Sequence, residues 1–256
     1  MSLEIVTLPA LADNYFFLIH NSETGETALI DAPEAAPVKA ALAERRWQLT
    51  QILLTHHHYD HIDGAEELRS ATGAKVIGAK ADAHRLPALD LEVSEGDRFE
   101  IAGTSCEVFD VSGHTLGHIA FYLPDEKAVF TADSLMAFGC GRLFEGTPEV
   151  MFESLAKLTA LPADTTVYSG HEYSAGNGTF ALSVDGDNPA VQARVAENAR
   201  KRDAGEPTGV STLQLELNTN PFLRCQEKAL IRAAGLGTDA APAAVFAEIR
   251  RQKDNF

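Results

Sequence analysis

A seven-residue stretch with four histidines is the part of the chain best suited to chemistry: Thr55-His56-His57-His58-Tyr59-Asp60-His61. Four of the nine histidines of the protein fall within six residues there, with an aspartate among them. Imidazole and carboxylate groups are ligands that suit Zn, Fe or Mn, and no cysteine lies nearby. Because one ion rarely takes so many ligands from one loop, the stretch indicates two metal ions.

The elements around this stretch indicate how its side chains divide between the two ions. The apolar run 51–54 predicts a buried β-strand before the histidines, and residues 64–72 predict a helix after them. Side chains alternate in direction along a strand, so His56 and His58 are expected to face one ion. Asp60 and His61, further round the turn, are expected to serve the second ion. By the same alternation His57 and Tyr59 point away and are expected to pack.

Later strand ends supply further candidate ligands. His114 lies between two glycines in a predicted tight turn and is the expected third ligand of the first ion. Asp133 ends the predicted strand 128–131, and its two carboxylate oxygens suit a bridge between both ions. His171 follows the predicted strand 166–169 and completes the set of the second ion. We expect His118 to orient its loop through a hydrogen bond, and Asp31 to act in a turn or to orient a ligand.

The composition places these residues in an ordinary globular protein. The chain has 256 residues, of which 45% are hydrophobic and 23% are charged, and no apolar run is long enough to cross a bilayer. Its N-terminus lacks the basic start of a signal peptide. The three cysteines are odd in number and far apart, which favours a reducing compartment. We therefore expect a cytoplasmic protein with no membrane partner, and a monomer.

The charge is unevenly distributed along the chain. Residues 1–173 hold 11 Lys and Arg against 27 Asp and Glu and carry the whole net charge of −16, whereas residues 174–256 are neutral. The acidic part contains the metal motif, where two divalent ions would offset some of the excess. An acidic protein is poorly suited to phosphate backbones, so a nucleic-acid partner, including a tRNA-processing role, is disfavoured.

A water molecule shared by two such ions suggests the reaction. A metal ion lowers the pKa of bound water from about 16 to roughly 7, which supplies hydroxide at neutral pH without a separate base. One ion can also polarise a carbonyl, so the expected reaction is hydrolysis of an ester-like bond. No conspicuous acid is available to protonate a poor leaving group. A thiol has a pKa of about 8.5 and can leave as the thiolate, which favours a thioester as the substrate.

The motif T-H-x-H-x-D-H resembles the signature of the metallo-β-lactamase superfamily. This resemblance implies an α/β fold, in which two β-sheets and flanking helices form an αββα sandwich. We expect residues 1–173 to form this catalytic domain and residues 174–256 to form a smaller helical domain that binds substrate. The residue pattern predicts an extended segment at 211–218 and helices at 37–46, 64–72, 148–161, 189–204, 228–234 and 242–253.

Further stretches resemble glyoxalase II, the hydroxyacylglutathione hydrolase family, over nearly the whole chain. They are Phe130-Thr131-Ala132-Asp133-Ser134-Leu135, Gly139-Cys140-Gly141-Arg142-Leu143-Phe144-Glu145-Gly146-Thr147, Gly170-His171-Glu172-Tyr173, Asn220-Pro221-Phe222-Leu223-Arg224 and Arg250-Arg251-Gln252-Lys253-Asp254-Asn255-Phe256. The resemblance implies cleavage of S-D-lactoylglutathione, and of related S-2-hydroxyacylglutathiones, in the detoxification of methylglyoxal. The products are D-lactate and glutathione.

The same resemblance implies a role for each matching residue. It gives the first ion His56, His58 and His114, the second ion Asp60, His61 and His171, and both ions Asp133. Asp60 and Asp133 are then catalytic because they hold the ions beside the bridging hydroxide. Zinc is the expected metal, with iron and manganese as alternatives. The glutathionyl group is expected to contact Arg142, Phe144, Tyr173, Arg250 and Lys253.

Two substrate positions depart from some family members, which carry Lys and Tyr where this chain has Arg142 and Phe144. Arginine keeps the positive charge with a different geometry, whereas phenylalanine removes a hydroxyl and one substrate hydrogen bond. The alternatives on the same fold are a persulfide dioxygenase, which uses a single iron, and a lactonase or β-lactamase. We do not expect these classes to carry the C-terminal helical domain with its R-x-x-K pair, Arg250 and Lys253.

Overall fold

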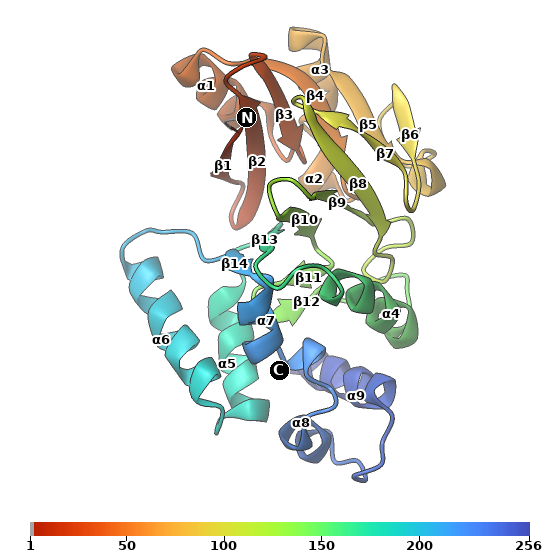
Figure 1. The fold of residues 1–256 in the computed structure, drawn as a ribbon, viewed down its shortest axis with the longest axis vertical. Coiled ribbons are helices and arrows are strands. Elements are labelled where there is room, and N and C mark those ends of the chain that lie inside the picture. Colours follow the sequence, from red (N-terminus) through yellow and green to blue (C-terminus); the bar gives the residue numbers. More distant parts are fainter. Residues whose placement is uncertain (1–2) are drawn as a thin grey trace. The chain divides into compact units, whose positions relative to one another are not determined.

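The computed structural model describes residues 3–256 and divides the chain into two compact units. The described part of the first unit, residues 3–110 and 116–131, begins with a sheet in which strands β1 to β6 lie in chain order (Figure 1). The strands β1 to β3 pair antiparallel, and β3 to β6 pair parallel. Their bounds are Leu3–Ala10, Asn14–Asn21, Glu26–Ile30, Gln48–Leu54, Lys75–Ala79 and Leu91–Val93.

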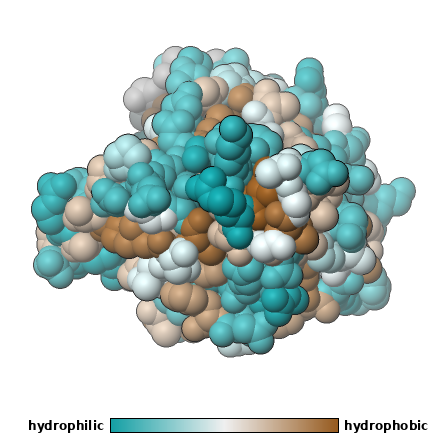
Figure 2. Space-filling view, turned by 90° about the horizontal axis from the view of Figure 1, so that it is seen from below, coloured by the Kyte–Doolittle hydropathy of each residue, from teal (hydrophilic) through white to brown (hydrophobic). Residues whose placement is uncertain are grey.

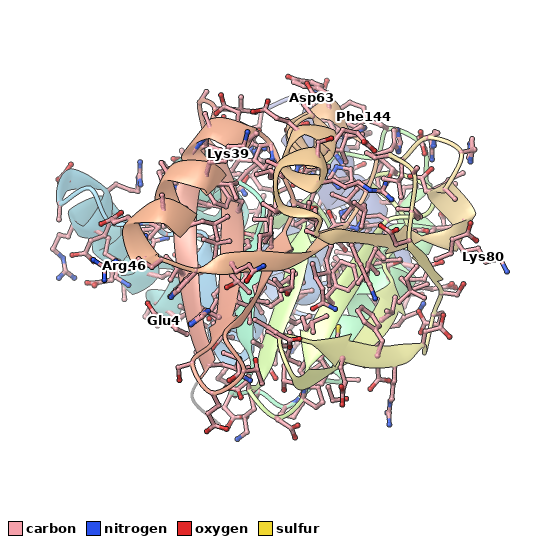
Figure 3. The ribbon with its side chains drawn as sticks, turned by 90° about the horizontal axis from the view of Figure 1, so that it is seen from above. Glu4, Lys39, Arg46, Asp63, Lys80 and Phe144 are labelled. Carbon is pink, nitrogen blue, oxygen red and sulfur yellow. The ribbon has the colours of Figure 1, made fainter. Side chains whose placement is uncertain are left out.

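Helical crossovers connect the parallel strands, because a tight turn cannot return a chain in the same direction. Helix α1 (Ala35–Arg45) joins β3 to β4, and Figure 3 labels Lys39 on it and Arg46 directly after it. The four-residue helix α2 (Tyr59–Ile62) and helix α3 (Ala65–Thr72) join β4 to β5, and α3 contacts both of these strands. The four-histidine stretch therefore lies in a crossover, at the carboxyl end of β4.

A second run of strands in the first unit is antiparallel and packs against the first sheet. It comprises β7 (Arg98–Ile101), β8 (Thr104–Asp110), β9 (Ile119–Leu123) and β10 (Ala128–Ala132). Every residue of β9 and β10 is buried. The ring of Phe17 on β2 lies 5.4 Å from the ring of Phe130 on β10, so the core lies between two stacked layers of strands.

The second unit, residues 111–115 and 132–256, is mainly helical. Helix α5 packs against α6 and α8, and α4 packs against α9. Proline occupies the first turn of α4, α6 and α9, where a missing N–H costs nothing. Its elements are β11 (Leu135–Met136), β12 (Gly139–Cys140), α4 (Pro148–Thr159), β13 (Thr166–Ser169), α5 (Ser174–Asp185), α6 (Pro189–Asp203), β14 (Val210–Thr212), α7 (Leu213–Thr219), α8 (Lys228–Ala233) and α9 (Pro242–Asp254).

The predicted helices agree with α1, α3, α4, α6, α8 and α9 to within two residues at either end. The extended segment predicted at 211–218 is confirmed only at residues 211–212, which belong to β14. It is wrong from Leu213, where α7 begins and the Thr212 hydroxyl accepts from the amide of Leu215. The sequence pattern also missed α5, whose glycines at 176 and 178 lower its helix propensity. Packing of one face against neighbouring helices compensates for that weak propensity.

The surface and the helix lengths complete this description. On the face shown in Figure 2, hydrophilic residues predominate and enclose smaller hydrophobic patches. Within residues 3–256, every helix is too short or too polar to cross a membrane.

Candidate metal centre

The first unit brings together His56, His58, Asp60 and His61, as the sequence predicts. His56 Nε2 and His58 Nδ1 lie 3.2 Å apart, and His61 Nε2 lies 3.7 Å from Asp60 Oδ2. Two nitrogens on one tetrahedral zinc, each at about 2.05 Å, would be about 3.3 Å apart. The spacing of His56 and His58 therefore fits two ligands of a single ion.

Neighbouring oxygens hold the other ring nitrogens of two of these histidines. His61 Nδ1 lies 2.8 Å from Asp31 Oδ2, and His56 Nδ1 lies 3.0 Å from the hydroxyl of Thr55. Asp31 is itself fixed by the amide and the hydroxyl of Thr55, both at 2.9 Å. Each contact directs Nε2 toward a prospective ion. Asp31 thus orients a candidate ligand, which is one of the two roles expected for it.

Asn14 and Asp82 are two positioning residues that sequence reasoning missed. Asn14 Nδ2 donates to the side chain and to the backbone carbonyl of Asp60, both at 3.0 Å. His57 Nδ1 lies 2.9 Å from Asp82 Oδ2, and Asp82 is fully buried. His57 therefore packs, as predicted, and Asp82 anchors its ring, whereas the packing predicted for Tyr59 is wrong, because this residue is 70% exposed. Neither Asn14 nor Asp82 belongs to a motif, and each is far in sequence from its partner.

His118 also lies close to this cluster, although its expected hydrogen-bonding role is still a prediction. Its ring is stacked on that of His56, with centroids 4.6 Å apart and an interplanar angle of 12°. The two flat faces limit rotation of the His56 imidazole, so stacking supplements the contact with Thr55.

In the second unit, His114, Asp133 and His171 form a cluster of their own. Asp133 Oδ2 lies 3.4 Å from His114 Nε2 and 3.2 Å from His171 Nε2, and all three residues are buried. A hydrogen bond of 3.0 Å from the amide of Gly170 to the carbonyl of Ala132 joins the ends of β13 and β10. One carboxylate oxygen beside two imidazole nitrogens is an arrangement suited to metal binding.

A close approach of backbone to side chains shapes this second cluster. His114 Nδ1 donates to the carbonyl of Arg142 at 2.8 Å, which leaves Nε2 for a metal. Gly141 donates from its amide to the carbonyl of Ser134 at 3.1 Å. A Cβ at position 141 would lie 2.0 Å from the carbonyl oxygen of Asp133 and 3.0 Å from His114 Nδ1. Only glycine fits there.

Two exposed aromatic rings flank the imidazoles of the second unit. The ring of Phe144 meets that of His114 edge to face at 5.2 Å, and Tyr173 stacks on His171 at 4.7 Å with an interplanar angle of 6°. Phe144, labelled in Figure 3, is 61% exposed and Tyr173 is 41% exposed. Both rings therefore offer apolar surface to a ligand beside candidate metal ligands.

The predicted cations of the second unit differ in their surroundings. Arg250 is buried and donates to the carbonyl of Cys140 and to Asp254 Oδ1, both at 2.9 Å. Arg142 is exposed, and its Nε lies 3.7 Å from the same Asp254 carboxylate. Burial lowers the pKa of Lys253, and the charges of Arg250 and Arg142 lower it further. One carboxylate thus faces three cations, which favours binding of an additional anion.

Glu172, in the G-H-E-Y stretch, had no role assigned from sequence. Its carboxylate accepts from the amide of Thr208 and the hydroxyl of Ser174, both at 2.7 Å. These contacts hold Glu172 in place, and with it the backbone that joins His171 to Tyr173. No periodicity in the sequence connects Thr208 with Glu172, because 36 residues separate them.

Comparison with known proteins identifies two parts of the chain. Residues 12–171 match the family model of the metallo-beta-lactamase superfamily, and residues 172–256 match that of the hydroxyacylglutathione hydrolase C-terminus. Hydroxyacylglutathione hydrolases of Ruegeria pomeroyi and Cereibacter sphaeroides are 60% and 59% identical over the full length of both chains. The solved structure of ETHE1 from Myxococcus xanthus covers 99% of this chain and 98% of its own, with a TM-score of 0.67 and 25% identity.

These matches confirm the predicted fold class. The N-terminal part has the αββα metallo-β-lactamase fold, and a C-terminal helical domain follows it. The resemblance inferred from the quoted motifs is also confirmed, because the similar relatives align from end to end.

We predict that Gly141→Ala weakens metal binding. The added methyl group must displace either the Asp133 carbonyl or the His114 ring, and a misplaced ligand typically costs about 10- to 100-fold in metal affinity. Competition against a chelator measures this loss directly. Gly176→Ala is the matched control, because a Cβ at that helical position meets no atom within 4 Å. Equal metal affinity in the two variants would contradict the prediction.

Proposed function

The chain belongs to the hydroxyacylglutathione hydrolase family, and we propose that its two clusters together hold the two divalent ions with which it hydrolyses S-D-lactoylglutathione. The family match makes the chain a thioester hydrolase. The observation that carries the assignment is the full-length identity to such hydrolases, which includes the C-terminal region. We propose that residues 1–173 form the catalytic domain and residues 174–256 bind substrate.

The donor set fits divalent metal ions. Five imidazoles and two carboxylates belong to groups that could hold a metal ion, and no thiolate is among them. Three of the imidazoles have one nitrogen held by an oxygen of the protein, as metal-binding histidines usually do. We propose His56, His58 and His114 for the first ion, Asp60, His61 and His171 for the second, and Asp133 for both. Zinc suits this set best, with iron or manganese as alternatives.

The protein groups indicate where the reaction obtains its nucleophile. Burial raises the pKa of the Cys140 thiol to about 11 and of the Cys225 thiol to about 12, and it also raises the pKa of Cys106. None of the three therefore offers a thiolate at neutral pH. Divalent ions, when bound, supply hydroxide at neutral pH and polarise the carbonyl of an ester. Asp60 and Asp133 contribute as holders of these ions.

The exposed groups of the second unit suit the glutathionyl part of the substrate. Lys253 and Arg142 supply positive charge for its glycine carboxylate, and Phe144 and Tyr173 supply apolar surface along the peptide. Arg250 is held by Cys140 and Asp254, so we propose that it supports this site electrostatically. The leaving thiolate of glutathione requires no protonation by an acid of the protein.

Three further properties are part of the proposal. Unpaired buried thiols at Cys106, Cys140 and Cys225 suit a reducing compartment, so we propose a cytoplasmic location. We also propose a monomer whose only partner is the small thioester. A persulfide dioxygenase or a lactonase is not favoured, because residues 172–256 match the hydroxyacylglutathione hydrolase C-terminus and the full-length relatives are hydroxyacylglutathione hydrolases.

The direct test is hydrolysis of S-D-lactoylglutathione by the purified, metal-loaded protein, with a simple lactone in parallel. We expect saturable turnover of the thioester alone. Removal of the metal with a chelator is expected to abolish turnover, and added zinc is expected to restore it. Turnover of the lactone alone, or unchanged activity after complete metal removal, would refute the proposed function.

We predict that Asp133→Ala abolishes hydrolysis and removes the second ion. The carboxylate oxygen that lies between His114 and His171 is lost, so kcat should fall by about 10³-fold or more. Elemental analysis of the dialysed protein then finds one metal per chain. Asp125→Ala, at an exposed loop position, serves as the control and is expected to keep both metal ions. Two metals with normal turnover would exclude a bridging role.

We predict that Lys253→Ala raises KM about tenfold with little change in kcat. Contact with a remote carboxylate is made in the ground state and in the transition state alike, and loss of a charge-assisted hydrogen bond costs about 1.5 kcal/mol. Initial rates over a range of substrate concentration give both constants. Lys228→Ala, at an exposed position on α8, is the matched lysine control.

The wild-type KM should also depend on pH. The pKa of Lys253 is below the ordinary lysine value, so its charge is lost at a lower pH than for a free lysine. KM therefore rises as the pH rises through this lowered pKa. In Lys253→Arg, whose guanidinium remains protonated, that rise is absent. The same rise in both proteins would remove Lys253 from the substrate site.

A further inference from the structure

A strained hairpin directly precedes the loop that carries Arg142 and Phe144. Strands β11 and β12 pair Leu135 with Cys140 and Met136 with Gly139, which leaves a turn of two residues, 137 and 138. Phe138 has a φ of +58°, in the left-handed region that side chains rarely adopt. Turns of this kind usually place glycine or asparagine at such a position. The sequence of the turn therefore does not explain its shape, and something else must impose it.

Glu216 on α7 fixes that turn from a fully buried position. Its carboxylate accepts from the amide of Phe138 at 3.1 Å, and also from Arg194 and Ser211. The guanidinium of Arg194, on α6, lies 4.1 Å above the Phe138 ring. The strained residue is thus held through its amide and through its ring by two helices of the C-terminal region.

Asn220 fixes the two strands of the same hairpin. Its Nδ2 donates to the carbonyls of Met136 at 3.1 Å and of Gly139 at 2.9 Å, and to Glu216 at 3.1 Å. Asn220 begins the N-P-F-L-R stretch, which resembles the family motif but had no role assigned to it. The side chain bonds only backbone and carboxylate groups there, so its contribution is to the position of the hairpin.

The hairpin leads directly to the groups proposed to bind substrate. Gly141 and Arg142 follow β12 at once, and the Arg142 carbonyl accepts from His114. A buried ion pair such as that of Glu216 and Arg194 contributes little net stability relative to apolar residues of similar volume. The pair therefore serves to position the hairpin, because Glu216 accepts from the Phe138 amide and an apolar side chain could not.

We propose that Glu216 and Asn220 are positioning residues that set the hairpin 135–140 so that Arg142 and Phe144 face the glutathionyl group. This inference rests on the proposed function. The C-terminal region then has two roles. It supplies Lys253, and through Glu216 and Asn220 it positions the loop that carries Arg142 and Phe144. Neither residue touches the reacting atoms.

The test uses the metal-loaded variants Asn220→Ala and Glu216→Gln. Asn220→Ala removes both carbonyl contacts without leaving a buried charge unpaired, whereas Glu216→Gln removes the charge and keeps the shape. Gln214→Ala is the control, since it is exposed on the same helix. For each protein, kcat and KM for S-D-lactoylglutathione, the bound metal, and the Kd of the inert thioether S-methylglutathione by calorimetry are measured.

The proposal expects KM and the thioether Kd to rise together, by about tenfold, in at least Asn220→Ala. It expects kcat and bound metal to remain within about twofold of wild type, because the bound ion itself fixes His114. Loss of kcat or metal at unchanged Kd would overturn it, as would an unchanged Kd with unchanged activity. Failure of both variants to fold would also overturn it, because the network would then serve only the fold. A wild type that binds the thioether without hydrolysing the thioester would refute the proposed function instead.

Discussion

The candidate metal centre depends on one constraint: an imidazole presents a defined nitrogen to a metal only if its other nitrogen is held. The chain meets this constraint in three ways, with the hydroxyl of Thr55 for His56, the carboxylate of Asp31 for His61 and the carbonyl of Arg142 for His114. Each oxygen lies at the end of a strand or just after one. The sheets therefore do more than form a core, because they fix the atoms that orient the ligands.

The sequence predicted the elements whose signal is local. His56, His58 and His61 lie within one short motif. The cluster that they form with Asp60 could therefore be predicted from the alternating directions of side chains along a strand and from the turn that follows. Helix α7 could not, because seven residues with only one face buried give too short a periodic signal. The extended interpretation of 211–218 failed from residue 213 onward for that reason, and the missed helix carries Glu216.

Long-range partners were beyond local sequence reasoning for a related physical cause. Asp82, Asn14 and Thr208 act through hydrogen bonds to residues 25 to 46 positions away, and no periodic pattern marks such contacts. Arg250 shows the converse, since its spacing from Lys253 indicated a shared helix face. In the structure it is buried against Cys140 and Asp254, while Lys253 remains partly accessible.

The contacts that hold the hairpin at residues 135–140 can form only late in synthesis, because their partners lie far along the chain. Its contacts with Glu216, Asn220 and Arg250 span from 78 to 110 residues of chain. During synthesis, the histidine motif therefore leaves the ribosome long before the side chains that hold this hairpin. The carbonyl partner of His114 follows the hairpin, so its position is set last. The hairpin therefore reaches its final position only after the helices that carry Arg194, Glu216 and Arg250 have been synthesised and have packed.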